Sequence, residues 1–220
     1  GSEIVTAVET RQQILVYTDE SLYAMQFLGP PFTFGVNLVS ENITTMGPLC
    51  AVAVEDNVFW MGQKEFYVYG GTVQRLPCTV RDFVFDDINL NQREKIVAST
   101  NTSFSEVWWF YPSASSDTND RYVVYNYEQQ VWYFGAMARS FWMDRGIFDQ
   151  PIAAGPNNYL YSQETGFDDD GSALTAYIES SQIDIADGEQ FSFIRRMIPD
   201  LTFRGSTAGS PSANITVKTR

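Results

Sequence analysis

The sequence predicts an all-β protein, and three observations support that prediction. Apolar and polar residues alternate with a period of two along most of the chain, as they do in strands that bury one face. The alternating runs are rich in β-branched and aromatic residues, and aromatic residues make up 15% of the 220 residues. Asp, Asn and Gly separate the runs, and these residue types tolerate the positive φ angles that tight hairpins require.

Six hairpins are predicted in chain order from this pattern. They join residues 14–18 to 21–27, 51–55 to 58–61, 65–69 to 72–76, 96–99 to 107–110, 122–127 to 131–135, and 152–155 to 159–161. Helix-forming residues are scarce. Residues 82–95 contain the best of them, in Leu90–Lys95, and predict either one helical turn or a connecting loop.

The hairpins resemble repeats of one unit, in which an apolar strand, a polar turn and an aromatic strand follow one another. The turns of these units fall near residues 19, 56, 102 and 157, at intervals of 37, 46 and 55 residues. A four-stranded propeller blade takes roughly 40–50 residues. The sequence therefore predicts a β-propeller of about four to five blades, partial or complete, with a loop insertion in the last interval. The first two strands of each blade are expected to line its inner part.

The pattern changes after about Gly166, which suggests an additional C-terminal β unit. We predict an expression scar at residues 1–2, propeller blades at 3–166, and a last irregular blade or the edge of a second β domain at 167–220. Longer strands are expected at 174–179, at 191–203 and from 214 onward. The final run alternates like a strand and has no closing turn, so we expect a truncated piece of a longer protein.

Charge and composition exclude several function classes. The formal net charge is −13, with 14 basic and 27 acidic residues, whereas a protein that grips phosphates needs a basic surplus. The chain has no histidine, so a Ser-His-Asp or Cys-His site cannot be built in it. Nucleotide-binding glycine loops and apolar runs of 18 residues are missing. The sequence predicts neither an enzyme nor a cofactor.

Two acidic segments are weak candidates for a cation site. Asp168, Asp169 and Asp170 offer carboxylate oxygens, but the spacing of a helix-loop-helix calcium site is absent. The segment Asp86-Asp87 with Asn89 and Asn91 lacks the glycine and the closing glutamate of such a site. Solvated loops are the favoured interpretation of both segments.

Aromatic pairs raise the possibility of a sugar-stacking platform. Trp108-Trp109 and Trp132-Tyr133 are adjacent in sequence, so the two members of each pair point to opposite faces of a strand. Core packing between blades is therefore favoured. Arg195-Arg196 predicts either an interface patch or a structural ion pair, with one arginine inward and one outward.

Cys50 and Cys78 lie in apolar strand-like runs without a neighbouring CxxC pattern. Buried free thiols are the favoured interpretation, and a disulfide between the two stays open.

Several segments, taken in order, resemble a known family. The residues that carry the resemblance are Phe59–Gly62, Phe66–Gly71, Leu76–Cys78, Glu106–Ser113, Asn119–Tyr127, Trp132–Gly135, and Asp168–Ala173 followed by Tyr177–Ser180. Together they are similar to tail nozzle or tail hub proteins of short-tailed phages, a group that includes the tail tubular protein B-like and packaged-DNA stabilisation protein-like chains. The resemblance covers residues 11–220.

The resemblance implies a non-catalytic β-propeller that assembles as a homo-oligomeric ring, usually a hexamer, around the channel for DNA. It implies contacts with an adaptor or portal-proximal ring above and with tail fibres or a needle below. It implies a virion protein made in the host cytoplasm, past which DNA moves without specific binding. Two other classes stay open: a carbohydrate-binding or glycoside-cleaving propeller, and a calcium-dependent adhesion module.

Overall fold

The computed structural model describes residues 3–166, 168–169, 171–173, 177–180, 193–206 and 209–218. Contacts divide the chain into two compact units, Gly1–Phe167 and Asp168–Arg220. Gly1 and Ser2, the predicted expression scar, lie outside the described residues. Among the helices of the described ranges, none combines the length and apolar composition that a membrane crossing requires.

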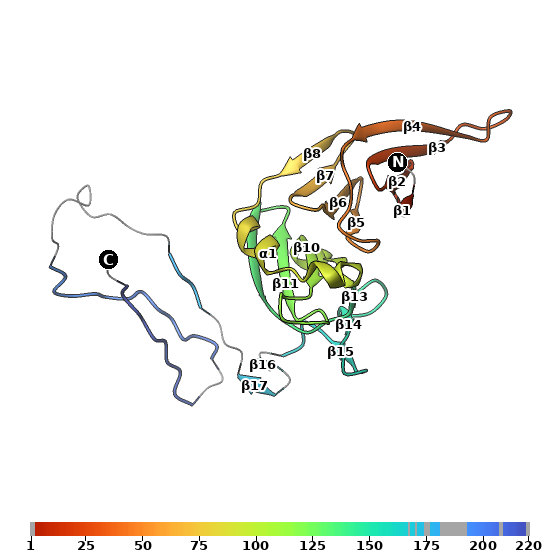
Figure 1. The fold of residues 1–220 in the computed structure, drawn as a ribbon. Helices are drawn as coiled ribbons and strands as arrows, with labels where there is room; N and C mark the ends of the chain where they lie inside the picture. Colours follow the sequence, from red (N-terminus) through yellow and green to blue (C-terminus); the bar gives the residue numbers. More distant parts are fainter. Residues whose placement is uncertain are drawn as a thin grey trace. The chain divides into compact units, whose positions relative to one another are not determined.

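The first unit is a series of antiparallel sheets, each formed by consecutive strands (Figure 1). Blade 1 consists of β1 (Ile4–Glu9), β2 (Ile14–Thr18), β3 (Ser21–Phe27) and β4 (Phe34–Glu41). Blade 2 consists of β5 (Ala51–Val54), β6 (Asn57–Met61), β7 (Phe66–Tyr69) and β8 (Val73–Leu76). Blade 3 consists of β9 (Val97–Asn101), β10 (Glu106–Tyr111), β11 (Arg121–Asn126) and β12 (Val131–Ala136). Blade 4 has three strands, β13 (Phe141–Met143), β14 (Ile152–Ala154) and β15 (Leu160–Ser162).

The first strands of the four blades follow one another in space. β1 contacts β5, β5 contacts β9, and β9 contacts β13. Sheets of meander topology whose first strands meet in succession are the arrangement of a β-propeller, in which those strands lie nearest the axis. The first unit is therefore a partial propeller, and the predicted all-β, propeller fold is confirmed.

The repeat is more regular than the sequence suggested. The first strands begin at Ile4, Ala51, Val97 and Phe141, so successive starts are 47, 46 and 44 residues apart. The predicted loop insertion in the last interval is wrong. The turns at 19 and 157 join the second and third strands of their blades, whereas those at 56 and 102 join the first and second, so the predicted intervals compared unlike turns.

Blade 1 departs from the prediction at its first strand. The hairpin of residues 14–27 is the middle pair of the blade, because β1 precedes it and pairs with β2 from Ile4↔Thr18 to Glu9↔Ile14. The expected inner position is therefore wrong for this hairpin, and also for the hairpin of residues 152–161, because β13 precedes it as the first strand of blade 4. It holds for blades 2 and 3, where residues 51–61 and 97–110 form the first two strands.

Each junction between blades is a separate apolar layer. Between blades 1 and 2 it contains Leu15, Tyr17, Leu22, Val58 and Trp60. Between blades 2 and 3 it is the largest, and it includes the fully buried Phe66, Trp109 and Tyr111. Between blades 3 and 4 it contains Trp108, Phe110, Val124, Trp142 and Ala153. Because strand residues alternate between faces, each middle blade contributes one face to each neighbouring layer.

The connection between blades 2 and 3 is helical over two short segments. α1 (Arg81–Asp87) buries Val84 against the junction of those blades. A 3-10 helix (Leu90–Lys95) follows, and the side chain of Asn89 caps it by accepting a hydrogen bond from the Asn91 N–H at 3.1 Å. The helical turn expected at Leu90–Lys95 is thus present, and α1 precedes it in the same connection.

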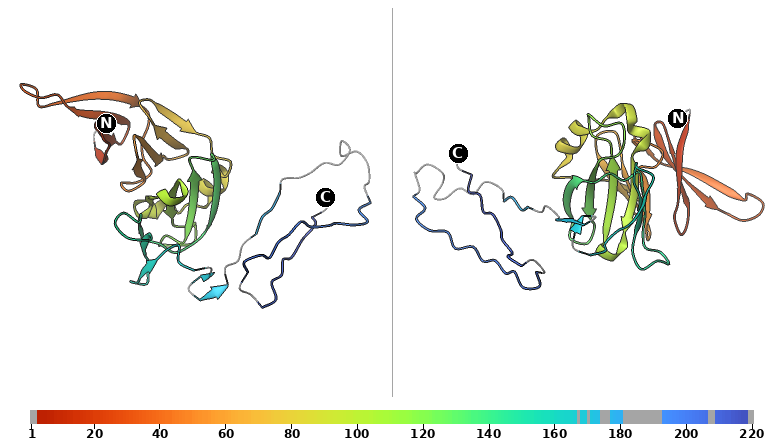
Figure 2. Two further views of the ribbon diagram at one scale, coloured as in Figure 1. Left: turned by 180° about the vertical axis from the view of Figure 1, so that it is seen from behind. Right: turned by 90° about the horizontal axis from the view of Figure 1, so that it is seen from below.

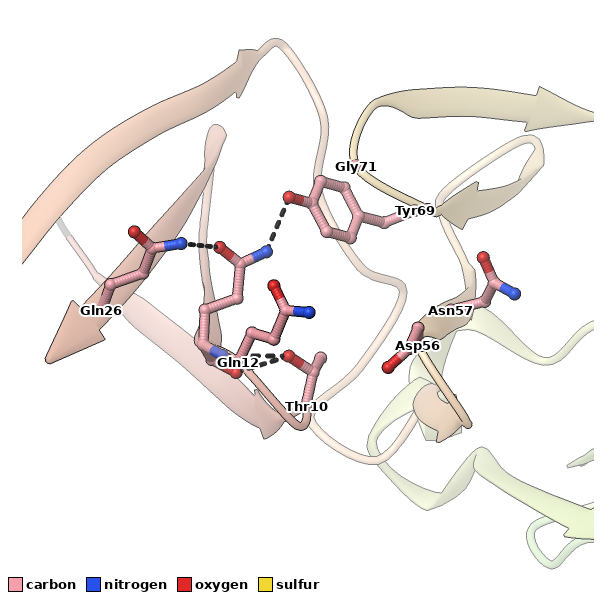
Figure 3. Close-up of a pocket in the computed structure, with 9 residues that line it drawn as sticks. Thr10, Gln12, Gln26, Asp56, Asn57, Tyr69 and Gly71 are labelled. Atoms are coloured by element: carbon pink, nitrogen blue, oxygen red, sulfur yellow. Dashed lines mark hydrogen bonds between the residues drawn. The ribbon is translucent and has the colours of Figure 1, made fainter.

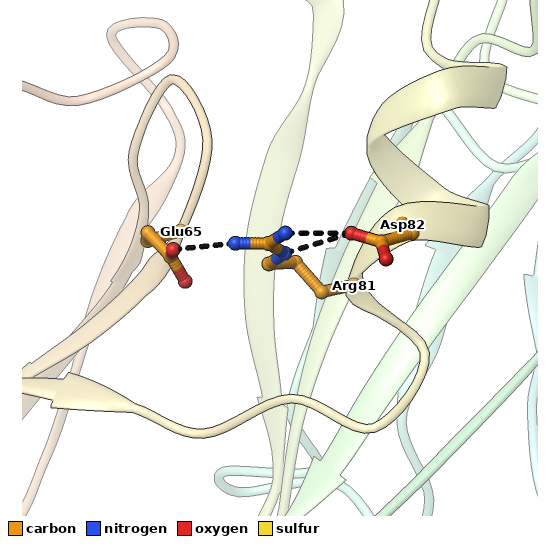
Figure 4. A network of polar contacts seen from close by, with 3 residues as sticks. All are labelled: Glu65, Arg81 and Asp82. Carbon is orange, nitrogen blue, oxygen red and sulfur yellow. Dashed lines mark hydrogen bonds and ion pairs between the residues drawn. The ribbon is translucent and has the colours of Figure 1, made fainter.

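An ion-pair network holds α1 against blade 2 (Figure 4). The Arg81 guanidinium lies between two carboxylates, with Nη1 2.7 Å from Glu65 Oε1 and Nη2 2.7 Å from Asp82 Oδ1. Glu65 precedes β7, and Asp82 lies in the first turn of α1. The network therefore ties the entry of the helix to the β6–β7 turn.

In the second unit, Asp168–Asp169 (β16) and Ser172–Ala173 (β17) pair as a small antiparallel hairpin. Lys218 Nζ lies 2.6 Å from Glu179 Oε1. Residues 177–180, 193–206 and 209–218 are in neither helix nor strand. The longer strands predicted there are wrong for these residues, because no described partner strand pairs with them in a ladder. Residues 174–176 and 191–192 of those predicted strands lie outside the described residues.

Candidate functional site

The adjacent tryptophans of β10 are divided between two layers of the core. Trp109 is fully buried at the junction of blades 2 and 3, and its Nε1 donates a hydrogen bond to the Cys50 carbonyl oxygen at 3.0 Å. Trp108 is 6% exposed at the junction of blades 3 and 4, where it stacks on Trp142 with ring centroids 5.1 Å apart. The prediction of core packing is confirmed, and neither ring offers a face for a sugar.

The second aromatic pair is also divided between faces. Trp132 packs against the layer between blades 2 and 3, and its Nε1 donates to the Pro77 carbonyl oxygen at 2.8 Å. Tyr133 points to the other face, and its hydroxyl donates to Glu106 Oε1. Burial, followed by that hydrogen bond to a carboxylate, raises the pKa of Tyr133 well above its ordinary value.

Glu106 is a buried carboxylate with both oxygens engaged. Trp108 Nε1 donates a hydrogen bond to its Oε2 at 2.8 Å, and the Tyr133 hydroxyl donates one to its Oε1. Partial burial and the negative charge of Glu106 raise the pKa of Glu164, which accepts a hydrogen bond from Asn101 Nδ2 at 3.2 Å. The side chains around Glu106 thus satisfy a buried polar group within the sheet. In the part of the chain that the structure describes, no three Cys, Asp or Glu side chains gather as a metal site.

The acidic segments singled out in the sequence have local structural partners. Asp168 and Asp169 form β16, and Asp168 Oδ1 accepts a hydrogen bond from the Gly171 N–H at 3.0 Å. Asp170, the third candidate calcium ligand, lies outside the described residues. In the other segment, Asp87 Oδ2 lies 3.7 Å from Arg121 Nε, and the Asn89 amide donates to the Ser116 carbonyl oxygen at 2.9 Å.

Two further predictions concern arginines and thiols. Arg195 and Arg196 are both exposed, so the expected inward and outward division is wrong, because no strand forms there to alternate their directions.

Cys50 and Cys78 are free thiols, which settles the open question of a disulfide. Burial raises the pKa of Cys50 to about 12 and that of the half-buried Cys78 to about 11.

A polar pocket of about 380 Å³ lies at the junction of blades 1 and 2 (Figure 3). Its lining residues are mostly uncharged, and they include Gln12, Gln13, Gln26, Asn57 and Tyr69. A chain of hydrogen bonds crosses the pocket wall. Gln26 Nε2 donates to Gln13 Oε1 at 3.0 Å, and Gln13 Nε2 donates to the Tyr69 hydroxyl at 2.6 Å. The amides of blade 1 are thereby joined to a strand of blade 2.

An apolar sheet face on blade 1 is a larger candidate surface. Cross-strand pairing places Tyr23 between Val16 and Leu38, and Met25 between Ile14 and Val36. These residues alternate with those that pack on blade 2, so they lie on the opposite side of the sheet. We call this side the outer face of blade 1. Its apolar residues are Ala7, Ile14, Val16, Tyr23, Met25, Phe27, Phe34, Val36 and Leu38, and Glu9, which pairs with Ile14, lies on the same side.

The outer face of blade 1 continues along a projecting hairpin. The ends of β3 and β4 extend away from the other blades, as Figures 1 and 2 show. Phe27 and Phe34 pair across this hairpin, with ring centroids 5.7 Å apart in an edge arrangement, and they are 69% and 55% exposed. Leu28 and Phe32 at the tip are exposed as well. Exposed apolar surface of this continuity is typical of a docking site.

Blade 4 has a similar face at the other end of the blade series. Trp142 and Ala153 pack toward blade 3, so the residues that alternate with them lie on the opposite side. We call this side the outer face of blade 4. It consists of Phe141, Met143, Ile152, Ala154 and Leu160, of which Phe141, Met143 and Leu160 are exposed.

Comparison with known proteins adds little about function. Neither a family model nor a curated protein matches the sequence. Among solved structures, the chain is similar to the WD40 domain of Pan2 from Neurospora crassa, at 15% identity with a TM-score of 0.41 over 70% of this chain. The chain spans 44% of the length of that structure. The propeller architecture follows from the chain's own sheets and the order of their first strands.

Proposed function

We propose that this chain is a structural component of the tail nozzle or hub of a short-tailed phage, part of the ring through which DNA passes. The observation that best supports this proposal is the division of its apolar surface. The tryptophan side chains of β10 are used in packing between blades, and the large uncommitted surfaces are the apolar outer faces of blades 1 and 4. Such faces suit a protein that assembles with others.

The tail assignment within this proposal rests on the resemblance across residues 11–220. The partners that follow from it are copies of the same chain, an adaptor or portal-proximal ring, and tail fibres or a needle. The net charge of −13 is compatible with a conduit, since an acidic wall repels the phosphates of passing DNA. In this function the chain works mechanically and carries out no bond-making chemistry.

The polar pocket favours one alternative, a carbohydrate-binding propeller. Amide side chains such as those of Gln12 and Asn57 donate and accept hydrogen bonds, as sugar hydroxyls require. Sugar sites also use an exposed aromatic face, and the Tyr69 ring in this pocket is only 7% exposed. The pocket therefore supports the alternative less well than the outer faces support assembly. A glycan array separates the two, because a nozzle component is expected to bind no glycan on it.

Localisation in the particle tests the tail assignment. Antibodies raised against this chain would be applied to purified particles of the phage that encodes it, and gold-labelled antibody would be located by electron microscopy. We expect label at the tail, together with rings that have a central hole in images of the isolated natural protein. Label absent from the particle, or found on the capsid shell, would reject the proposal.

A further inference from the structure

We propose that the outer face of blade 1 binds the outer face of blade 4 of a second copy of this chain, in a head-to-tail contact. The proposal names a surface and its occupant, and it holds or fails independently of the assignment to a phage tail. Its basis is the pairing pattern of the two faces, their chemistry, and the three blade junctions that the chain already contains.

The part of the outer face of blade 1 that β3 and β4 form belongs to a segment without charge. From Ser21 to Ser40 the sequence contains no Asp, Glu, Lys or Arg. Strands β3 and β4 lie within this segment apart from the final residue of β4, Glu41. Phe27, Phe34 and Val36 are exposed and have no charged residue opposite them in the β3–β4 pairing, so covering them loses little by desolvation.

The strands of the hairpin are apolar on one side and mostly polar on the other, which indicates what covers them. Gln26, Gly35 and Asn37 alternate with Phe27, Phe34 and Val36, so the opposite side carries amides and a glycine, and the Leu28 side chain lies over that glycine. A hairpin that entered a lipid bilayer would have to satisfy its polar side there at a high cost. A sheet with one apolar and one polar side instead packs against another sheet, with water on its far side.

Three junctions inside the chain show how such a face is covered. At each of them, one apolar face of a blade packs on an apolar face of the next blade, while the first strands of the two blades meet. The outer face of blade 4 is the one that blade 4 would present to a following blade, and the outer face of blade 1 is the one that would receive a preceding blade. A second copy placed head to tail therefore continues an interface that the chain already forms three times.

The experiment measures association of the 220-residue chain by sedimentation velocity in 0.15 M salt, which screens the repulsion between acidic copies. We expect dimers and larger species to form as the concentration rises from about 1 to about 100 µM. Val36→Glu places a charge in the outer face of blade 1 and is expected to weaken association at least about tenfold. Asn37→Glu is the matched control, because it adds the same charge to the neighbouring exposed residue on the opposite side of β4.

Mixing two variants tests the head-to-tail geometry. Leu160→Glu changes the outer face of blade 4 at a side chain that is 76% exposed, so folding is expected to be unaffected. Each variant alone retains one intact face and is expected to associate at least about tenfold more weakly than the wild-type chain. An equimolar mixture with Val36→Glu combines one intact face of each kind, and it is expected to form dimers without larger species.

Three results would overturn the proposal. They are a wild-type chain that stays monomeric throughout the concentration range, a Val36→Glu variant that associates like Asn37→Glu, and a Leu160→Glu variant that associates like the wild type. The last result would assign the contact to blade 1 against blade 1. Circular dichroism melting of every variant establishes that it is folded, and Phe34→Lys replaces Val36→Glu if the latter unfolds.

Discussion

The indole of Trp109 donates a hydrogen bond to the carbonyl oxygen of Cys50 across the junction of blades 2 and 3, over 3.0 Å. Trp109 lies in the second strand of blade 3, and Cys50 immediately precedes the first strand of blade 2. The Trp109 ring also packs against the rings of Phe66 and Trp132, at centroid distances of 4.9 and 5.9 Å. One side chain therefore joins two blades by packing and by a directed polar contact.

Replacing Trp109 is expected to destabilise the propeller strongly. Trp109→Ala removes a fully buried ring and leaves a cavity, which typically costs about 3–5 kcal/mol of unfolding free energy. Chemical denaturation in urea measures the change. Tyr159→Ala is the control, since that ring is exposed and its removal is expected to change stability by at most about 0.5 kcal/mol. Equal effects of both substitutions would contradict the inter-blade role of Trp109.

Tyr69→Phe is expected to weaken the junction of blades 1 and 2. The substitution removes the hydroxyl that accepts a hydrogen bond from Gln13 Nε2 at 2.6 Å, and such a bond contributes about 0.5–1.5 kcal/mol. A double-mutant cycle with Gln13→Ala isolates the pair. The expected coupling is of that same size, and additive effects of the two substitutions would show that the bond contributes nothing.

The stability of the propeller is expected to depend on pH through Glu164. Burial and the charge of Glu106 raise its pKa in the folded chain above the value in the unfolded chain. The folded state then holds the proton more tightly, so the stabilisation is complete below the unfolded pKa and is lost as the pH rises through the folded pKa. Melting temperatures across the acidic range measure this loss. Glu164→Gln is expected to flatten the profile, and profiles that stay parallel would argue against the linkage.

The two thiols are expected to differ in reactivity toward a disulfide reagent at pH 8. Cys50 is buried with a pKa of about 12, so it should react only when the chain unfolds. Cys78 is half-buried with a pKa of about 11, and it should react slowly in the folded protein. We expect the kinetic trace of the folded protein to show one slow phase, from Cys78. The second thiol, Cys50, is expected to react only after denaturant is added. Cys78→Ser should remove the slow phase and leave the denaturant-dependent one.

The strands of the middle blades could be predicted from sequence because their signals are local. In blade 2, for example, alternation and the turn between Val54 and Asn57 define a hairpin without reference to the rest of the chain. The opposite placement of Trp108 and Trp109 also follows from strand geometry alone. Strands β1, β4 and β13 are not among the predicted hairpins. β4 alternates clearly from Phe34 to Leu38, so its signal is present in the sequence. β13 has only three residues, too few for a period of two to stand out.

The all-β class and most of the hairpins follow from residue types at short spacing, and so does the lack of histidine. The equivalence of the hairpins, the succession of the first strands β1, β5, β9 and β13, and the apolar faces that are left uncovered follow from the folded arrangement. Alternation shows that a strand has two faces, whereas what covers each face depends on residues tens of positions away in the chain.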